Sequence, residues 1–182
     1  MLDLIKKSYL CTPMDRMYGY IVDLKGMTDD AVSHRWVLTG DFFSAVQGKE
    51  ISDGQVNVAL RVKRTSEAFE LEFQYEGVVV VECDRCLEPM NQPIQGTCSL
   101  RAKLGEEDND DGDLITVSET PGTLDLSWHL YEMLALEIPI RHVHVDGECN
   151  PNVMECLKPQ KAEKPVDPRW AALEALKTKI NK

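Results

Sequence analysis

The 182-residue sequence lacks any apolar run that approaches the roughly 20 residues of a membrane-spanning helix. Its amino terminus, MLDLIKKSYL, places Asp3, Lys6 and Lys7 inside a short apolar stretch, unlike a secretory signal peptide. These absences predict a cytoplasmic protein with no membrane partner. In that compartment the six cysteines are expected to be reduced thiols or metal ligands rather than a disulfide framework.

The sequence also lacks an excess of positive charge, because its formal net charge is −11. Nucleic-acid binders usually carry a basic surface that neutralises phosphates, whereas an acidic body repels RNA and attracts basic proteins. The charge is unevenly distributed. Residues 158–182 contain seven Lys/Arg against three Asp/Glu, a balance of +4, which leaves −15 for the first 157 residues. The sequence therefore predicts an acidic body with a basic tail.

Motifs of catalysis are absent as well. No serine, histidine and acid trio stands out, no glycine-rich loop could cradle a phosphate, and no two acidic residues share an apolar setting. His142 and His144 alternate in RHVHV and so share one face, where histidines are more often solvated or packed than catalytic. The sequence thus predicts a protein that is not an enzyme and has no small-molecule substrate.

What the sequence does contain is a clear strand pattern. Apolar residues alternate with polar or small ones in QVNVALRVKR, from Val56 to Val62, and in EAFELEFQYE, from Phe69 to Tyr75. The short break at Thr65 and Ser66 predicts an antiparallel hairpin, although it lacks the usual Asn-Gly turn. Further strands are expected at 32–40, 78–83, 93–104 and 114–117, and a short helical turn capped by Asp41 at 41–46.

The periodicity becomes helical after Asp125. Leu126, Leu130, Met133 and Leu134 recur at helical spacing, and Pro139 ends the predicted helix. A second short helix is expected after residues 150–151. The fold class predicted from these patterns is α+β, a β-rich antiparallel sheet or partly open barrel with a few helices and a C-terminal amphipathic helix. A chain of this length buries about 70% of its unfolded surface, so it needs no metal merely to fold.

The predicted domain organisation is a single β-rich acidic domain over residues 1–157, followed by residues 158–182. The second part begins with a linker rich in proline and lysine and closes with a basic helix that starts at Pro168. Trp170, Leu173, Leu176 and Ile180 form one apolar stripe on this helix. Such a stripe more commonly packs back on its own domain, and the alternative is that it folds on a partner.

The stretch VVVVECDRCLEPM carries a Cys-x-x-Cys pair, Cys83 and Cys86, at the end of a predicted strand. A redox pair normally sits at a helix amino terminus, but here Pro89 and Pro93 follow and no helix is expected. A zinc site suits the corner better, since a strand–turn–strand knuckle presents two thiolates to a metal. The plainest interpretation is a pair of partly buried thiols in a structural corner.

A zinc site needs further ligands, and the candidates are Cys149, Cys156, His144 and, on the returning strand, Cys98. Cys149 and Cys156 are seven positions apart, unlike the tight pair of a zinc ribbon, and 62 residues separate Cys86 from Cys149. From the residues alone, ordinary thiols are therefore favoured over zinc, and zinc over redox chemistry.

Two blocks of the sequence resemble the YceD family, the bacterial and plastid proteins named for accumulation of large-subunit ribosomal RNA. The first is the valine strand that ends in ECDRCLEP and returns through GTC, and the second is LDLSWHLYEMLALEIPIRHVHVDGECNP, with DPRWAALEALK at the end. The resemblance implies a non-enzymatic role in the synthesis, processing or stability of 23S rRNA and in assembly of the large ribosomal subunit. It also implies partners, namely the large-subunit rRNA or pre-50S particle and a small basic ribosomal protein.

The resemblance assigns the family's paired cysteines to Cys83 and Cys86 and its late cysteine to Cys149. Some relatives have a second Cys-x-x-Cys there, which Asn152 breaks in this chain, so a bound zinc would need Cys156 or His144 as its fourth ligand. The alternative function is a zinc-stabilised interaction module with an unrelated partner. A thiol-dependent enzyme is a third, less favoured, alternative.

Combined with the charge pattern, the resemblance suggests a division of labour. We hypothesise that the acidic body binds a basic ribosomal protein, while the tail helix docks on rRNA or another surface of the subunit. The candidate partner-binding residues of the tail are Arg169, Trp170, Lys177 and Lys179.

Overall fold

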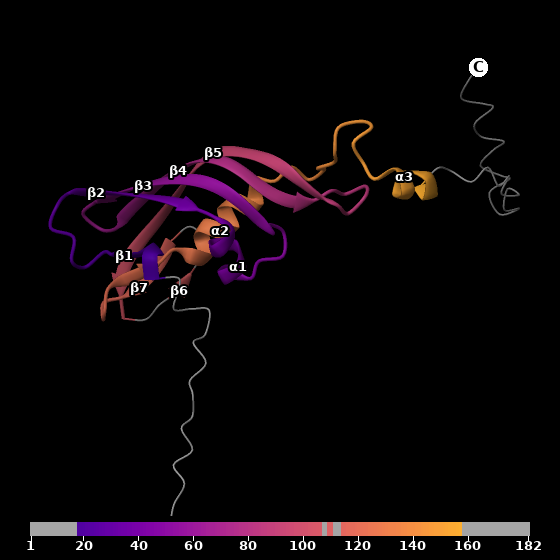
Figure 1. Ribbon diagram of the computed structural model, residues 1–182. Coiled ribbons are helices and arrows are strands. Elements are labelled where there is room, and N and C mark those ends of the chain that lie inside the picture. Colours follow the sequence, from indigo (N-terminus) through magenta and orange to yellow (C-terminus); the bar gives the residue numbers. More distant parts are fainter. Residues whose placement is uncertain (1–17, 107–108, 111–113, 158–182) are drawn as a thin grey trace, which may run out of the picture. The chain divides into compact units, whose positions relative to one another are not determined.

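The computed structural model describes residues 18–106, 109–110 and 114–157 (Figure 1). In chain order the elements are η2 (Tyr18–Tyr20), β1 (Ile21–Asp23), β2 (Ala31–Leu38), α1 (Gly40–Val46), β3 (Asp53–Arg64), β4 (Phe69–Glu82), β5 (Pro89–Gly105), β6 (Asn109–Asp110), β7 (Leu114–Ser118), β8 (Thr123–Asp125), α2 (Ser127–Leu136) and α3 (Pro151–Leu157). This mixture of strands and short helices confirms the predicted α+β class.

Six of these strands form one sheet in the order β2-β3-β4-β5-β7-β6, and β1 pairs with β8 in a small second sheet. The pairs from β2 to β5 are antiparallel, as the sequence predicted, but β5 and β7 run parallel. The large sheet is therefore mixed. The described strands form no closed barrel, because β2 and β6 stand at its two ends.

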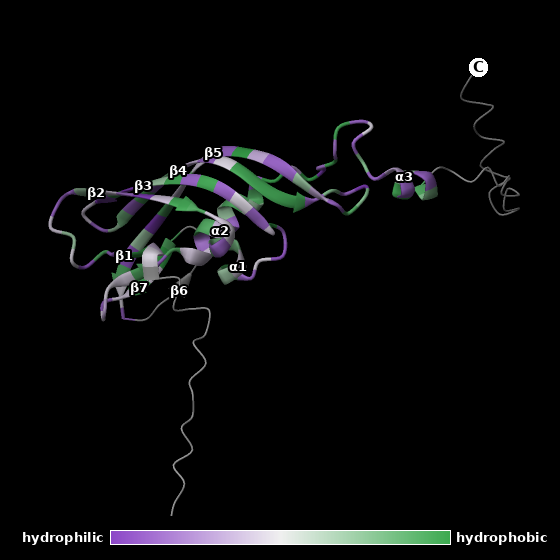
Figure 2. Ribbon diagram, viewed as in Figure 1, coloured by the Kyte–Doolittle hydropathy of each residue, from purple (hydrophilic) through white to green (hydrophobic). Residues whose placement is uncertain are grey.

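The hairpin of β3 and β4 is the best-predicted part of the fold. Its register places Leu60 opposite Phe73, and both side chains are buried, whereas the residues between the apolar ones face solvent. Figure 2 shows the resulting alternation of apolar and polar residues along the long strands. Thr65 closes the turn without Asn-Gly chemistry, since its hydroxyl donates to the carbonyl of Ala68 at 2.7 Å and accepts from the Ala68 N–H at 3.1 Å.

Two of the predicted strands are one strand in the structure. The segment after Gly77 continues β4 without interruption, so that Gly77 pairs with Val56 on one side and Ile94 on the other. A Cβ atom at Gly77 would collide with the backbone carbonyl of Gln55. Glycine thus lets β3 approach β4 closely, and the long strand reaches as far as the first cysteine.

Helices α1 and α2 lie on the same side of the large sheet (Figure 1). Their buried residues, among them Phe42, Phe43, Leu130 and Leu134, join the inner-face residues of the strands in one hydrophobic core. The stripe predicted for the second helix is confirmed. The predicted cap of the first helix is wrong, because Asp41 lies in its first turn and Thr39 precedes the helix without a side-chain cap.

Helix α2 ends at Leu136, before Pro139 as predicted, and the expected short helix after residue 150 is α3. Among the described residues no helix is both long enough and apolar enough to cross a membrane. A first compact unit ends at Cys149, and α3 belongs to a second unit that starts at Asn150. The predicted boundary at residue 157 stays a prediction, since residues 158–182 lie outside the described part.

Candidate metal centre

The first half of the site is the corner loop, residues 83–88, which joins β4 to β5. The Cys83 N–H donates to the carbonyl of Glu88 at 2.9 Å, and the Leu87 N–H donates to the carbonyl of Cys83 at 2.8 Å. Leu87 takes a left-handed backbone conformation with φ of 61° and exposes 70% of its surface. This tight turn leaves Cys83 and Cys86 buried on its inner side.

The second half is the 139–149 segment, residues 139–149, which follows α2 and lies against the corner loop. The Asp84 N–H donates to the carbonyl of His142 at 3.0 Å, and the His142 N–H donates to an Asp84 carboxylate oxygen at 2.8 Å. An exposed ion pair joins Arg85 to Asp146 at 3.6 Å. These contacts hold together two parts of the chain that are 58 residues apart.

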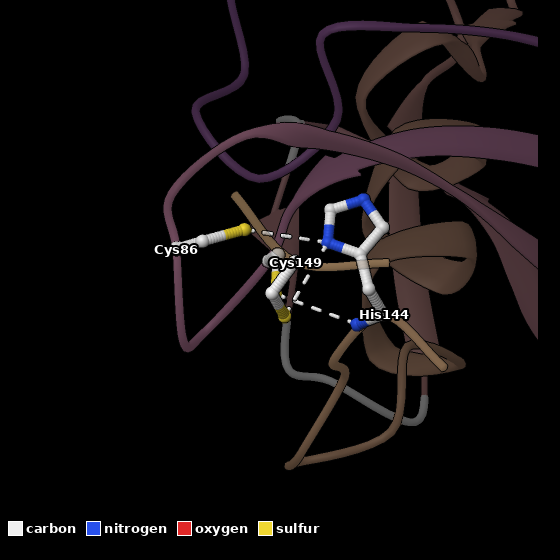
Figure 3. Close-up of side chains that lie close together, drawn as sticks. Cys86, His144 and Cys149 are labelled. Carbon is white, nitrogen blue, oxygen red and sulfur yellow. Dashed lines mark hydrogen bonds between the residues drawn. The ribbon is translucent and has the colours of Figure 1, made fainter. Parts of the chain in front are cut away.

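The Cys/His cluster, formed by Cys83, Cys86, His144 and Cys149, lies where these two halves meet. The three sulfur atoms and a ring nitrogen of His144 all lie within 4.8 Å of one another. His144 Nδ1 is 3.3 Å from Cys86 Sγ and 4.0 Å from Cys149 Sγ, while the sulfurs of Cys83 and Cys149 are 4.0 Å apart. Figure 3 shows the His144 ring with this nitrogen turned toward Cys86 and Cys149.

The surroundings of the cluster favour a thiolate at Cys83. Burial would raise the pKa of this thiol, but backbone N–H donors of His144, Arg85 and Cys86 outweigh it and lower the pKa to about 6. The His144 and Arg85 N–H groups lie 3.4 Å from Cys83 Sγ. A sulfur that accepts two backbone N–H groups is already arranged as a negatively charged ligand atom.

The pKa values of His144 and Cys149 are shifted as well, in part by the charge of this thiolate. The hydrogen bond to Cys83 raises the pKa of His144, because the thiolate favours a protonated ring. Burial raises the pKa of Cys149, and its contact with Cys83 raises it further. Without a cation, these shifts favour the protonated forms of His144 and Cys149 beside the thiolate of Cys83.

Three thiols and one imidazole are the ligands that zinc prefers in proteins, so the cluster can hold a metal ion such as zinc. Cys83, Cys86 and Cys149 are buried and His144 is half-buried. An ion at their centre would therefore take all four ligands from the protein. A closed site of this kind stabilises structure, whereas catalytic zinc keeps one position open.

The structure brings together four of the sequence-derived candidates. Of the two residues considered as a fourth ligand, His144 belongs to the cluster, while Cys156 is exposed on α3 in the second unit. Cys98 lies opposite Phe73 in the sheet, outside the cluster. The tail candidates Arg169, Trp170, Lys177 and Lys179 lie outside the described residues.

The expectation that no helix follows Cys86 is confirmed, because β5 is the next element of the chain. The described cysteines are all free thiols. Sequence reasoning missed Asp84 and His142, whose mutual hydrogen bonds align the two halves. Asp84 stands between the two paired cysteines, which is a signal that could have pointed to it.

Apart from the cluster, the outer face of the sheet has a hollow of about 540 Å³ over the middle of β2, β3, β4 and β5. Its charged lining residues are Arg35 and Glu76, which offset one another. Farther along the face, Arg61 lies opposite Glu72, and Lys63 and Arg101 lie on either side of Glu70. Arg61 thus faces one glutamate, whereas Lys63 and Arg101 share Glu70, so the cross-strand glutamates offset only part of the positive charge in this part of the face.

The fold and the cluster define an acidic α+β domain with a Cys/His corner. Residues 71–177 match the family described as large ribosomal RNA subunit accumulation protein YceD, so the chain belongs to the YceD family. The matched range includes the corner loop, the 139–149 segment and all four residues of the cluster. No curated protein and no solved structure shows a significant match to the chain.

Proposed function

We propose that this protein is a non-enzymatic factor in the synthesis, processing or stability of 23S rRNA and in assembly of the large ribosomal subunit. It acts by binding to other molecules. Membership of the YceD family carries the proposal, since the family is named for large-subunit ribosomal RNA accumulation. The finer assignment to 23S rRNA and to assembly of the large subunit is our inference. It agrees with a closed Cys/His corner, which offers a bound metal no position for a substrate.

The charge distribution suggests which part of the protein meets which partner. The first 157 residues carry −15 and residues 158–182 carry +4. On the outer face of the sheet, glutamates lie opposite Arg61, Lys63 and Arg101 and offset part of their charge. We therefore assign a basic ribosomal protein to the acidic body, and rRNA or another surface of the large subunit to the tail.

The first experiment is sucrose-gradient fractionation of cell lysate with quantitative blotting for this protein. The assembly role predicts co-sedimentation with free or immature large subunits, and this association should weaken at high salt because it depends on charge. Two results together would overturn the proposal. The protein would sediment only at the top of the gradient, and deletion of its gene would leave the level of 23S rRNA unchanged. Those results would favour the interaction module with an unrelated partner.

A truncation tests the division of labour. The chain without residues 158–182 should retain binding to a basic ribosomal protein and lose most of its salt-dependent affinity for large-subunit rRNA. A matched control is the full-length chain with Arg169, Lys177 and Lys179 changed to Gln, which removes charge but not length. Unchanged RNA affinity in both variants would sink the assignment of RNA to the tail.

A further inference from the structure

We propose that Cys83, Cys86, His144 and Cys149 bind one structural zinc ion that latches the 139–149 segment onto the corner loop. The sequence alone favoured ordinary thiols, and the distances between the ligand atoms change that preference. The zinc site does not depend on the ribosomal role, because it follows from the side chains that the fold brings together.

The spacing of the ligand atoms fits tetrahedral coordination. Bond lengths of about 2.3 Å to sulfur and about 2.0–2.1 Å to nitrogen place tetrahedral ligands about 3.5–3.8 Å from one another. In the cluster, the Cys86 Sγ to His144 Nδ1 distance is 3.3 Å, and the Cys83 Sγ to Cys149 Sγ distance is 4.0 Å. All four atoms lie within 4.8 Å of one another, so small side-chain adjustments suffice to enclose an ion.

Ordinary packing explains this convergence poorly. Thiols are weak hydrogen-bond donors, yet three of them and an imidazole converge here from loops that are 58 to 66 residues apart. Two backbone N–H groups also point at the sulfur of Cys83, an arrangement that stabilises a thiolate.

The donor set selects the ion. Three soft sulfur ligands and one imidazole suit Zn(II), while Mg²⁺ and Ca²⁺ prefer oxygen ligands. The cluster uses Nδ1 of His144, so this nitrogen must be unprotonated in the bound state and Nε2 carries the proton. Three thiolates around Zn(II) leave a net charge of −1, which the N–H groups on Cys83 Sγ help to stabilise.

The latch has a structural consequence at the end of the first unit. Cys149 is the last residue of that unit, and Pro151, two residues later, begins α3. A metal bound by Cys149 fixes the point at which the chain leaves the first unit. The 139–149 segment has no regular secondary structure, so the metal supplies an anchor that a helix or strand would otherwise provide.

The test uses the full-length chain purified without chelators from cells grown with zinc. Metal analysis should find one zinc ion per chain. Replacement of the zinc by Co(II) should give intense visible d–d absorption, which is diagnostic of tetrahedral coordination, and a thiolate-to-cobalt charge-transfer band in the near ultraviolet. A protein that contains no zinc, and whose cobalt spectrum is that of the hydrated ion, would overturn the proposal.

Matched cysteine variants test the ligand assignment. Cys149→Ser and Cys86→Ser should lower zinc affinity by about 100-fold or more and weaken the charge-transfer band, since each removes a thiolate. Cys156→Ser and Cys98→Ser should leave both zinc content and cobalt spectrum unchanged, because neither residue belongs to the cluster. A loss of zinc in Cys156→Ser equal to that in Cys149→Ser would contradict the assigned ligand set.

A pair of His144 substitutions tests whether the imidazole is a ligand. Because these variants keep all three cysteines, they test the site even if a cysteine variant does not fold. His144→Ala should lower zinc affinity and open a position to water, which changes the d–d bands. His144→Cys should retain zinc and strengthen the charge-transfer band through a fourth thiolate. Wild-type affinity and spectrum in His144→Ala would show that His144 is not a ligand and would overturn the proposed site.

Discussion

Asp84 and His142 are joined by a reciprocal pair of hydrogen bonds, in which each residue's backbone N–H donates to the other residue. The Asp84 N–H donates to the His142 carbonyl at 3.0 Å, and the His142 N–H donates to the Asp84 carboxylate at 2.8 Å. His142 Nε2 also lies 3.5 Å from the second Asp84 carboxylate oxygen. The pair sets the position of His144, two residues beyond His142, relative to the paired cysteines.

Asp84→Ala removes the acceptor for the His142 N–H and should lower zinc affinity by about 10–100-fold, the usual effect of losing an outer contact that orients a ligand. Asp84→Asn is the control, because its amide oxygen can still accept from the His142 N–H. Competition with a colorimetric zinc chelator measures both variants. Equal affinity of Asp84→Ala and the wild type would show that the reciprocal bonds do not position the cluster.

Leu87 has a φ of 61° and exposes 70% of its surface, so its backbone is strained while its side chain contributes little burial. Left-handed backbone costs a residue with a side chain about 1–2 kcal/mol relative to glycine, and a β-branched residue more. Leu87→Gly should therefore keep or raise the free energy of unfolding, and Leu87→Val should lower it by about 1 kcal/mol. Urea denaturation measures both, and a Val variant more stable than the Gly variant would contradict the strained turn.

Much of the sheet could be predicted from the sequence because its signal is local. Alternation from Val56 to Val62 is sufficient to define one buried face of β3, and any antiparallel partner with the same alternation preserves it. The parallel pairing of β5 with β7 could not be predicted in this way. The short segment 114–117 indicates a strand but does not indicate its neighbour, which depends on how the chain crosses between them.

The residues of the site can likewise be predicted from the sequence where the signal is local, and cannot where it depends on long-range contacts. Cys83 and Cys86 form a motif that sequence spacing reveals directly, and the sequence also offers Cys149 as a candidate ligand. The choice of His144 over Cys156 was beyond the sequence, because it depends on how the segment after α2 returns to the corner loop. Reciprocal bonds between Asp84 and His142 direct that return, and the position of Asp84 between the two cysteines does not reveal His142 as its partner.

Tyr75 links β4 to the end of α2, since its hydroxyl donates to Glu137 Oε2 at 2.9 Å. Burial, the hydrogen bond to Glu137 and the charge of Glu137 raise the pKa of Tyr75 to about 12. A folded-state pKa above the unfolded value of about 10 means that this stabilisation is complete below about pH 10 and is lost as the pH rises toward 12. Tyr75→Phe should thus cost about 1 kcal/mol at neutral pH.

The measurement is urea unfolding of Tyr75→Phe and wild type at neutral pH and at about pH 11, where the difference between them should shrink. Comparing the two proteins at each pH cancels the titration of the cysteines, which both contain. Glu137→Gln keeps an acceptor but removes the charge, so in this variant the pKa of Tyr75 should lie closer to its unfolded value, and the alkaline loss should be smaller and end at lower pH. A difference between wild type and Tyr75→Phe that grows with pH would refute the assigned interaction.

Gly77 should be sensitive to a single added methyl group. A Cβ atom there would meet the carbonyl oxygen of Gln55 and the Cα of Val56, both of which are backbone atoms of β3 and cannot move independently. Gly77→Ala is expected to lower the free energy of unfolding by about 1–3 kcal/mol through overpacking. Gly19→Ala is the control, because no atom lies within 4 Å of its added Cβ, and it should be neutral or slightly stabilising. Equal stability of the two variants would show that the close approach of β3 and β4 is not tight.

Removal of zinc should loosen the 139–149 segment from the corner loop before it affects the sheet. The N–H groups of Arg85 and His144 both donate to Cys83 Sγ, so their protection from hydrogen exchange depends on a fixed, negatively charged sulfur. The N–H groups in the middle of β4 pair with β3 and β5, far along the strands from the corner loop. Adding a chelator should therefore increase exchange at Arg85, His144 and the rest of the 139–149 segment, while exchange in the middle of β4 stays slow.

Hydrogen-exchange mass spectrometry with overlapping peptides measures this contrast, and re-addition of zinc should restore protection. Uniform loss of protection across the strands would instead mean that the metal holds the whole fold together, and no change at all would mean that the hydrogen bonds of the two halves suffice without it.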